Sequence, residues 1–144
     1  MKLAILGCGK IANRIAKSAL LVDSIDLVGF GSKDVNKAKE YSEKYGCRDY
    51  GDYDHFFNSD IDAVYIAAYN PGHHALIKEA IKHHKAVICE KPMLFSLEEN
   101  KEVFAYAVWH VALHSRRAYF FTTHKLKAQG RHGRGSLSHA GCAV

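Results

Sequence analysis

The segment Lys2 to Ala12, KLAILGCGKIA, decides how the rest of the chain is interpreted. Its apolar run from Leu3 to Leu6 is short and continuous, which is typical of a strand buried on both faces. The run stops at Gly7, and Gly9 and Ala12 complete a G-x-G-x-x-A pattern. Apolar residues then recur at helical spacing. The pattern therefore lies between a strand and a helix, where dinucleotide-binding turns are found.

Each small residue of this pattern has a physical role. Gly7 permits a tight turn, and Gly9 has no side chain to hold a pyrophosphate away from the backbone. Ala12 allows the helix and the strand to pack closely. The unpaired amides and the positive end of the helix would face the phosphates. The alternative interpretation is an ordinary strand-to-helix turn that contains glycine.

Length and composition indicate one ordinary domain, because 144 residues suffice for a real core. The apolar start lacks the small-residue cleavage site of a signal peptide, and no apolar run approaches the ~20 residues of a membrane span. The cysteines are scattered and form no C-x-x-C pair, at positions Cys8, Cys47, Cys89 and Cys142. This spacing predicts reduced thiols and a cytoplasmic location.

The net charge of +5 comes from the end of the chain. Residues 1–102 carry 14 basic and 15 acidic side chains, whereas residues 103–144 carry six basic side chains and no acidic one. The nucleotide-binding part is thus close to neutral, and the basic character belongs to the tail.

Apolar patterning predicts strands that alternate with helices. Strands are expected at residues 2–7, 27–30, 47–50, 63–68 and 86–89, and helices at residues 10–21, 35–45, 52–58, 71–83 and 96–107. This alternation predicts an α/β fold, a Rossmann-type doubly wound parallel sheet with helices on both faces.

Three residues mark the expected helix ends. Asp34 is predicted to cap the helix over 35–45, which Gly46 ends, and Ser96 forms a capping box with Glu99. The buried faces are predicted to be Val35, Ala38, Tyr41 and Tyr45 on one helix, and Leu76, Ile77, Ala80 and Ile81 on another.

In open α/β sheets, ligands bind at the carboxyl ends of the strands. Those ends give the candidate cofactor-binding residues Gly7, Cys8, Gly9, Lys10, Ile11, Ser32, Lys33, Tyr69, Asn70, His74, Glu90 and Lys91.

The end of the second strand bears on the choice of dinucleotide. NAD commonly has an acidic partner for the ribose 2′-hydroxyl, and a cation accommodates the 2′-phosphate of NADP. Ser32 is able to donate to that phosphate and Lys33 to neutralise it, while Asp34 already serves as a helix cap. We therefore expect NADP, with NAD as the alternative if Asp34 reaches the ribose.

Lys91 follows a buried strand and lies beside Glu90, so its pKa could be tuned for proton transfer; the alternative is an exposed loop lysine. No metal site is predicted. The histidine pairs at 73–74 and 83–84 lack an H-E-x-x-H pattern and partner cysteines.

Four segments together resemble the Gfo/Idh/MocA family of NAD(P)-dependent oxidoreductases. They are GCGKIA at residues 7–12, GSKD at 31–34, DAVYIAA at 62–68 and CEKP at 89–92. The resemblance covers residues 1–107 and implies a cofactor-binding domain. It also implies hydride transfer between a nicotinamide and a carbinol carbon of a sugar, polyol or diol, with Lys91 as proton donor or acceptor.

Two departures from the family pattern stand out. The family's T-P-N-x-x-H loop is replaced by a segment in which Asn70 precedes Pro71, and His74 is taken as the matching histidine. The family's C-terminal α/β domain, which brings the substrate pocket, is not recognisable in this sequence.

Residues 108–144 form an atypical basic tail with five histidines and no acid. We interpret it as an aberrant or partly disordered end, of the kind that a reading-frame change or a truncated gene leaves. A partial strand signal at Ala118 to Thr123 speaks against this interpretation.

The favoured function is that of the cofactor-binding part of an NAD(P)-dependent oxidoreductase with a small carbohydrate-like substrate. The alternatives are a non-catalytic dinucleotide-binding module and an inactive gene fragment. Nucleic-acid binding through the basic tail is favoured least, because the tail has no recognisable reading motif. Self-association into a homo-oligomer is expected if the sheet lacks its usual partner.

Overall fold

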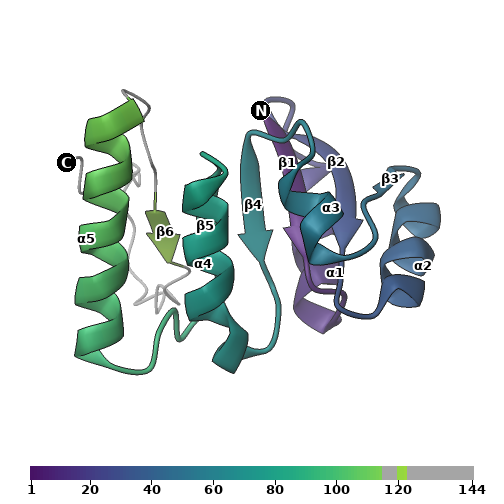
Figure 1. Cartoon of the computed structure of the whole chain (residues 1–144). Coiled ribbons are helices and arrows are strands. Elements are labelled where there is room, and N and C mark those ends of the chain that lie inside the picture. Colours follow the sequence, from purple (N-terminus) through teal and green to yellow (C-terminus); the bar gives the residue numbers. More distant parts are fainter. Residues whose placement is uncertain (115–119, 123–144) are drawn as a thin grey trace, which may run out of the picture.

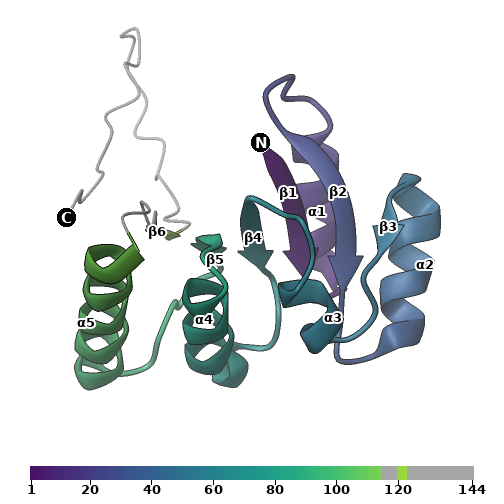
Figure 2. The ribbon, with the colours of Figure 1, turned by 45° about the horizontal axis from the view of Figure 1, so that its top comes forward.

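The computed structural model describes residues 1–114 and 120–122, which form a single parallel sheet with helices on both sides (Figures 1 and 2). The strand order is β3-β2-β1-β4-β5-β6 and every neighbouring pair is parallel. The strands are β1 (Lys2–Leu6), β2 (Asp26–Gly31), β3 (Arg48–Asp49), β4 (Ala63–Ile66), β5 (Ala86–Cys89) and β6 (Phe120–Thr122). This is the order of the doubly wound Rossmann fold, and it confirms the predicted fold class.

The helices divide into two layers. α1 (Lys10–Ala19) and α2 (Val35–Tyr45) pack with one face of the sheet. α3 (Tyr53–Phe57), α4 (His73–Lys82) and α5 (Leu97–His114) belong to the other side, where α4 and α5 lie side by side (Figure 1).

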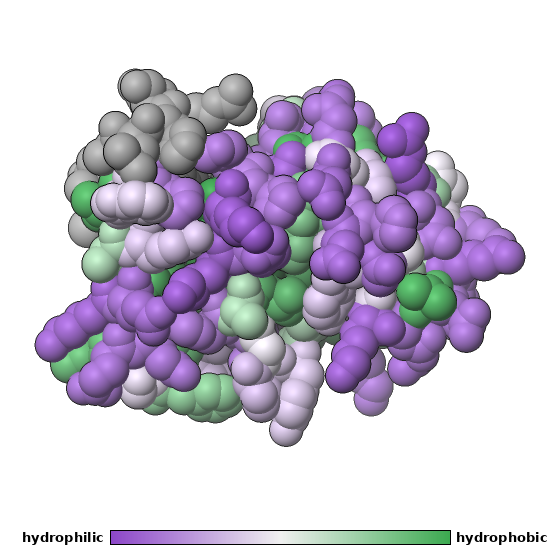
Figure 3. Space-filling model, viewed as in Figure 1, coloured by the Kyte–Doolittle hydropathy of each residue, from purple (hydrophilic) through white to green (hydrophobic). Residues whose placement is uncertain are grey.

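The sheet separates two apolar cores, because side chains alternate along each strand. In β1, Leu3 and Ile5 pack with α1, whereas Ala4 and Leu6 pack in the core beneath α4. All four are at most 2% exposed, as a strand covered on both faces requires. The face shown in Figure 3 is mostly hydrophilic, with only separate hydrophobic areas between its charged groups.

The predicted helix caps are confirmed. The Asp34 carboxylate accepts a hydrogen bond from the Asn36 amide, 3.2 Å away, at the start of α2. Gly46 ends that helix in the left-handed conformation, with φ of 64°. One prediction for the buried face is wrong: Val35, the first residue of α2, is 48% exposed, while Ala38 one turn later is fully buried.

Other helix boundaries differ from the expectation. Pro71 lies in a 3₁₀ turn, η1 (Asn70–Gly72), and α4 begins only at His73. The helix predicted to end at Ala107 continues to His114, since no glycine or proline interrupts it there.

Part of the tail belongs to the sheet. β6 (Phe120–Thr122) falls within the weak strand signal and pairs with β5, so it is the return strand that the sequence pattern left unmatched. The remaining expectations for residues 115–119 and 123–144 concern a part of the chain that lies outside the described residues. Within the described ranges, no helix is long and apolar enough to cross a membrane.

The C-terminal ends of α4 and α2 offer a test of backbone strain. His84 follows α4 with φ of 56°, a conformation that glycine adopts without cost, and Gly46 has the equivalent place after α2. We expect His84→Gly to raise the free energy of unfolding by about 0.5–1 kcal/mol and Gly46→Ala to lower it by about 1 kcal/mol. Urea unfolding of both variants measures this. A loss of stability in His84→Gly would show that the His84 side chain contributes more than its backbone strain costs.

Candidate functional site

The candidate site lies where four parallel strands end at one edge of the sheet. Leu6, the last residue of β1, is level with Gly31 of β2 on one side and Ile66 of β4 on the other. Ile66 is in turn level with Cys89, the last residue of β5. The loops that follow these strands therefore meet, and they carry most of the predicted site residues.

Gly7 is required by the protein's own backbone. Its φ is +100°, and its amide donates a hydrogen bond of 2.8 Å to the Gly31 carbonyl. A Cβ at this position would lie 2.7 Å from the backbone nitrogen of Ala68, in the loop after β4. Both the backbone angle and the close approach exclude a side chain. This glycine thus joins three strand ends.

Gly9 is different, because nothing in the described structure would touch a side chain there. No atom lies within 4 Å of an ideal Cβ on Gly9, and its φ of −128° suits any residue. Gly9 is also the N-cap of α1, which has no side-chain cap and no acid in its first turn. The uncapped amides and the helix dipole favour an anion at this end. The space before Gly9 thus fits a phosphate group that must approach the backbone.

Two tyrosines of α2 support the glycine loop. The Tyr41 hydroxyl donates to the Gly9 carbonyl at 3.1 Å, and the Tyr45 hydroxyl donates to the Asn13 side-chain oxygen at 2.6 Å. The sequence predicted both rings as part of the buried face but not this support. The signal was available, since a tyrosine on an inward face needs a partner for its hydroxyl.

At the end of β2, the structure separates the roles of three predicted residues. Ser32 is only 7% exposed, and its hydroxyl oxygen accepts a 3.2 Å hydrogen bond from the Asp34 amide. Asp34 caps α2, as described above, and Lys33 between them is exposed. Of the two groups considered for a 2′-phosphate, Lys33 is therefore the one that faces solvent.

Cys8 lies half-buried in the glycine loop. Burial raises the pKa of the Cys8 thiol to about 11, although a hydrogen bond with Ser32 opposes the shift. At neutral pH the thiol is protonated, so it is a neutral lining group and a poor nucleophile.

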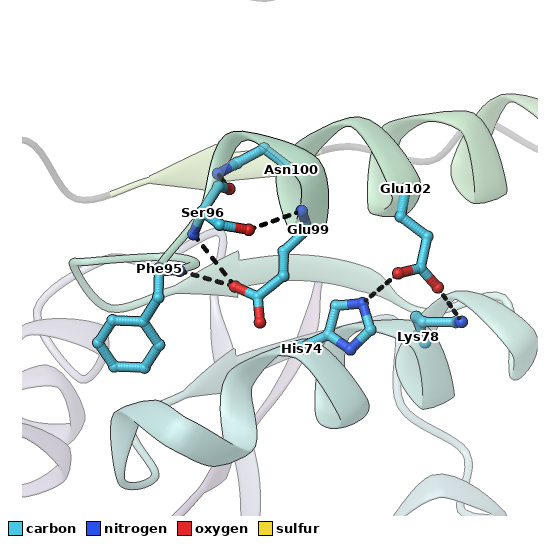
Figure 4. Close-up of polar contacts among 7 residues, drawn as sticks. All are labelled: His74, Lys78, Phe95, Ser96, Glu99, Asn100 and Glu102. Atoms are coloured by element: carbon cyan, nitrogen blue, oxygen red, sulfur yellow. Dashed lines mark hydrogen bonds and ion pairs between the residues drawn. The ribbon is translucent and has the colours of Figure 1, made fainter.

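The two adjacent histidines of α4 have separate surroundings. The His74 ring lies 3.1 Å from a carboxylate oxygen of Glu102 on α5, and Lys78 contacts the other oxygen at 2.6 Å (Figure 4). The Lys78 ammonium is the main cause that lowers the pKa of Glu102. The His74 side chain thus joins α4 to α5 through Glu102.

His73, which sequence reasoning did not select, is the histidine that reaches the strand ends. Its ring is fully buried and lies within hydrogen-bond distance of carbonyl oxygens of Ala68, Pro92 and Met93. The signal was available in the predicted buried face of α4, since His73 precedes Leu76 and Ile77 by three and four residues and therefore shares their face of the helix.

Glu90 and Lys91 follow β5 directly. The Glu90 amide donates to the Ile66 carbonyl at 3.1 Å, which places this loop beside the end of β4. One Glu90 carboxylate oxygen accepts from the Tyr65 hydroxyl at 2.5 Å, and the other lies 3.3 Å from the Lys91 amide nitrogen. Lys91 is exposed, and its peptide bond to Pro92 is cis. These contacts hold Glu90 in place, while the neighbouring Lys91 side chain is exposed to solvent.

A hollow lies at the opposite edge of the sheet, where the strands begin. Its lining includes Lys2, Asp26, Arg48 and Asp60. Lys2 and Asp60 neutralise one another as an ion pair. Gly46 in its lining is the C-cap of α2, and the carbonyl end of a helix disfavours an anion, so we do not assign the cofactor to this hollow. In the described part of the chain, no three histidine, cysteine or acidic side chains are arranged to hold a metal ion.

These features define the class of the protein: a Rossmann domain with a dinucleotide-type glycine loop at its carboxyl edge. The model of an oxidoreductase family with an NAD-binding Rossmann fold, Gfo/Idh/MocA, matches residues 1–113. The chain belongs to this family, as the motifs predicted.

Similar curated proteins are dehydrogenases. The chain is 27% identical over 110 residues to a trans-1,2-dihydrobenzene-1,2-diol dehydrogenase of Xenopus tropicalis, covering 74% of this chain and 33% of the relative. It is 28% identical over 114 residues to an inositol 2-dehydrogenase of Burkholderia cenocepacia, covering 76% and 34%. The chain thus spans about a third of the length of these relatives.

Solved structures share the fold. KijD10, a 3-ketoreductase from Actinomadura kijaniata in complex with NADP and TDP-benzene, superposes with a TM-score of 0.74 at 22% identity. The match covers 83% of this chain and 36% of KijD10. A probable dehydrogenase from Thermotoga maritima gives a TM-score of 0.73 at 20% identity, covering 85% and 35%.

Proposed function

We propose that this chain is the cofactor-binding part of an NAD(P)-dependent oxidoreductase that acts on a sugar, polyol or diol. The observation that carries the proposal is the open space before Gly9, bounded by uncapped helix amides. The relatives support the substrate class, because they are named for a diol and for inositol.

The dinucleotide would supply hydride transfer to or from a carbon atom. The chain's own contribution is to hold it: the backbone from Gly7 to Ile11 receives the pyrophosphate, and Lys33 lies near the end of β2, where the adenosine ribose is bound in this fold. The Tyr41 hydroxyl holds the glycine loop in position through its hydrogen bond to the Gly9 carbonyl.

Lys91 is the group that we assign to proton transfer at the substrate oxygen. Its amine is exposed at the carboxyl edge, and its backbone is fixed through Glu90 and Tyr65. An ammonium in this position donates a proton when a carbonyl is reduced and accepts it in the reverse direction. Tyr69 and Asn70, in the loop after β4, flank the same edge and are proposed to contact the cofactor.

NADP is the proposed cofactor, with NAD as the alternative. Lys33 is exposed and cationic, whereas the Asp34 carboxylate is occupied as a helix cap. The NADP in the KijD10 complex is consistent with this choice. The same loops would also serve a non-catalytic dinucleotide-binding module, which needs only the glycine turn and the uncapped helix start.

Gly9→Val tests dinucleotide binding. The new side chain meets no protein atom within reach of its Cβ, so we expect the free energy of unfolding to change by less than about 1 kcal/mol. It fills the space for the pyrophosphate, and NADPH binding should weaken by at least about 100-fold. Fluorescence titration measures this, beside urea unfolding of the same samples. Equal affinity of parent and variant would contradict the assignment.

Lys33→Ala tests the choice of cofactor. One charge-assisted hydrogen bond to a phosphate contributes about 1.5–3 kcal/mol, so the preference for NADPH over NADH should fall by roughly ten- to a hundredfold. Lys37→Ala, an exposed lysine of α2 paired with Asp34, is the control. Tighter binding of NADH than of NADPH by the parent would show that Asp34 is the ribose ligand.

A Lys91→Ala comparison tests catalysis by the chain alone. Holding the substrate carbon against the nicotinamide lowers a barrier by about 7–11 kcal/mol, and the relatives contain a further two-thirds of sequence to do so. We therefore expect NADPH oxidation with aldoses, ketoses and diketones to stay at the Lys91→Ala background. Robust turnover by the parent, lost in the variant, would show that this chain completes its own active site.

A further inference from the structure

His73 is a buried polar side chain whose ring contacts two loops at the carboxyl edge of the sheet. It is the first residue of α4 and is fully buried. Nδ1 lies 3.1 Å from the Pro92 carbonyl oxygen and 3.2 Å from that of Met93. Nε2 lies 3.0 Å from the Ala68 carbonyl oxygen. Each ring nitrogen is thus opposite a group that only accepts hydrogen bonds.

An imidazole ring carries at least one N–H, so His73 donates a hydrogen bond to a carbonyl of one loop while its ring packs against the other loop. Loss of the ring would leave these buried carbonyl oxygens without their side-chain partner, which is costly for buried polar groups.

The carbonyls that His73 contacts belong to two different loops. Pro92 and Met93 directly follow Lys91, whereas Ala68 lies in the loop after β4. Ala68 is also the residue whose backbone packs against Gly7. His73 therefore links the loop of the proposed catalytic lysine to the residue that supports the glycine turn.

We propose that His73 is the positioning residue that fixes the Lys91 loop relative to the cofactor-binding glycine turn. The role given to Lys91 rests on the function proposed above. His73 acts through carbonyl groups and touches neither cofactor nor substrate in this account. His83, at the opposite end of α4, provides a matched control, since that ring pairs with Glu79 of the same helix.

The first measurement is the protection of the His73 ring N–H in the full chain. With histidine labelled by nitrogen-15, the His73 ring is expected to show an N–H that exchanges slowly with water, because it donates to a buried loop carbonyl. The His73→Gln spectrum assigns the signal. A ring N–H that exchanges as fast as that of an exposed histidine would overturn the proposal, and this result does not depend on any variant being folded.

The second measurement separates positioning from general stability. Glutamine offers an N–H to one side only, so His73→Gln should free the Lys91 loop and shift the amide signals of Lys91 and Met93. Binding of NADPH, whose nicotinamide half would lie toward that loop, should weaken about three- to tenfold. Binding of ADP, which would use the glycine loop and the end of β2 but not the Lys91 loop, should stay within about twofold. His83→Gln should leave both affinities and both amide signals as in the parent.

Two results would contradict the positioning role: equal weakening of NADPH and ADP, or unchanged Lys91 and Met93 signals in His73→Gln. If the parent chain bound neither ligand, the proposed cofactor function would fail instead. The ring protons and the amide shifts would then still decide whether His73 fixes this loop.

Discussion

The close contact between Gly7 and Ala68 is the constraint on which the site depends. A side chain on Gly7 would overlap the backbone after β4, so the first turn and the β4 loop can approach only because this residue is bare. That approach brings the glycine loop to the middle of the carboxyl edge, between β2 and β4. The helix start at Gly9 and the lysine after β5 then lie on one edge as a consequence of topology.

The two glycines of the motif therefore have different roles, one in folding and one in leaving space for a ligand. Gly7 is fixed by the fold, whereas the protein itself makes no use of the missing side chain at Gly9. A residue that folding leaves free, placed at an uncapped helix start and braced by Tyr41, is what a phosphate-binding loop needs. The structure distinguishes the role of Gly7 from that of Gly9, whereas the sequence pattern contains both glycines without showing which role each has.

The fold was largely predictable because its signals are local. Buried β1 is a continuous apolar run, Asp34 and Gly46 mark the ends of α2, and each strand is followed by a helical pattern. The strand order follows from right-handed crossovers. The return strand was harder to predict, since three residues of β6 within a basic, histidine-rich segment give little periodicity.

From the sequence, the loops that form the candidate site could be predicted, but the directions of their side chains could not. Their places follow from the strand ends, but the direction of each side chain depends on long-range contacts that spacing does not encode. The Ser32 hydroxyl turns toward the start of α2, and His74 points to α5 while His73 turns inward. His74 was selected by its match to the family motif, whereas the structure places the His73 ring against the loops after β4 and β5.

The most direct test of the central claim is a map of where NADP⁺ binds to the chain, read from backbone amide signals during a titration. The account predicts that shifts concentrate in residues 7–11, at Lys33 and in residues 90–93, at the carboxyl edge of the sheet. Shifts that instead cluster around Lys2 and Arg48, in the hollow at the opposite edge, would contradict it.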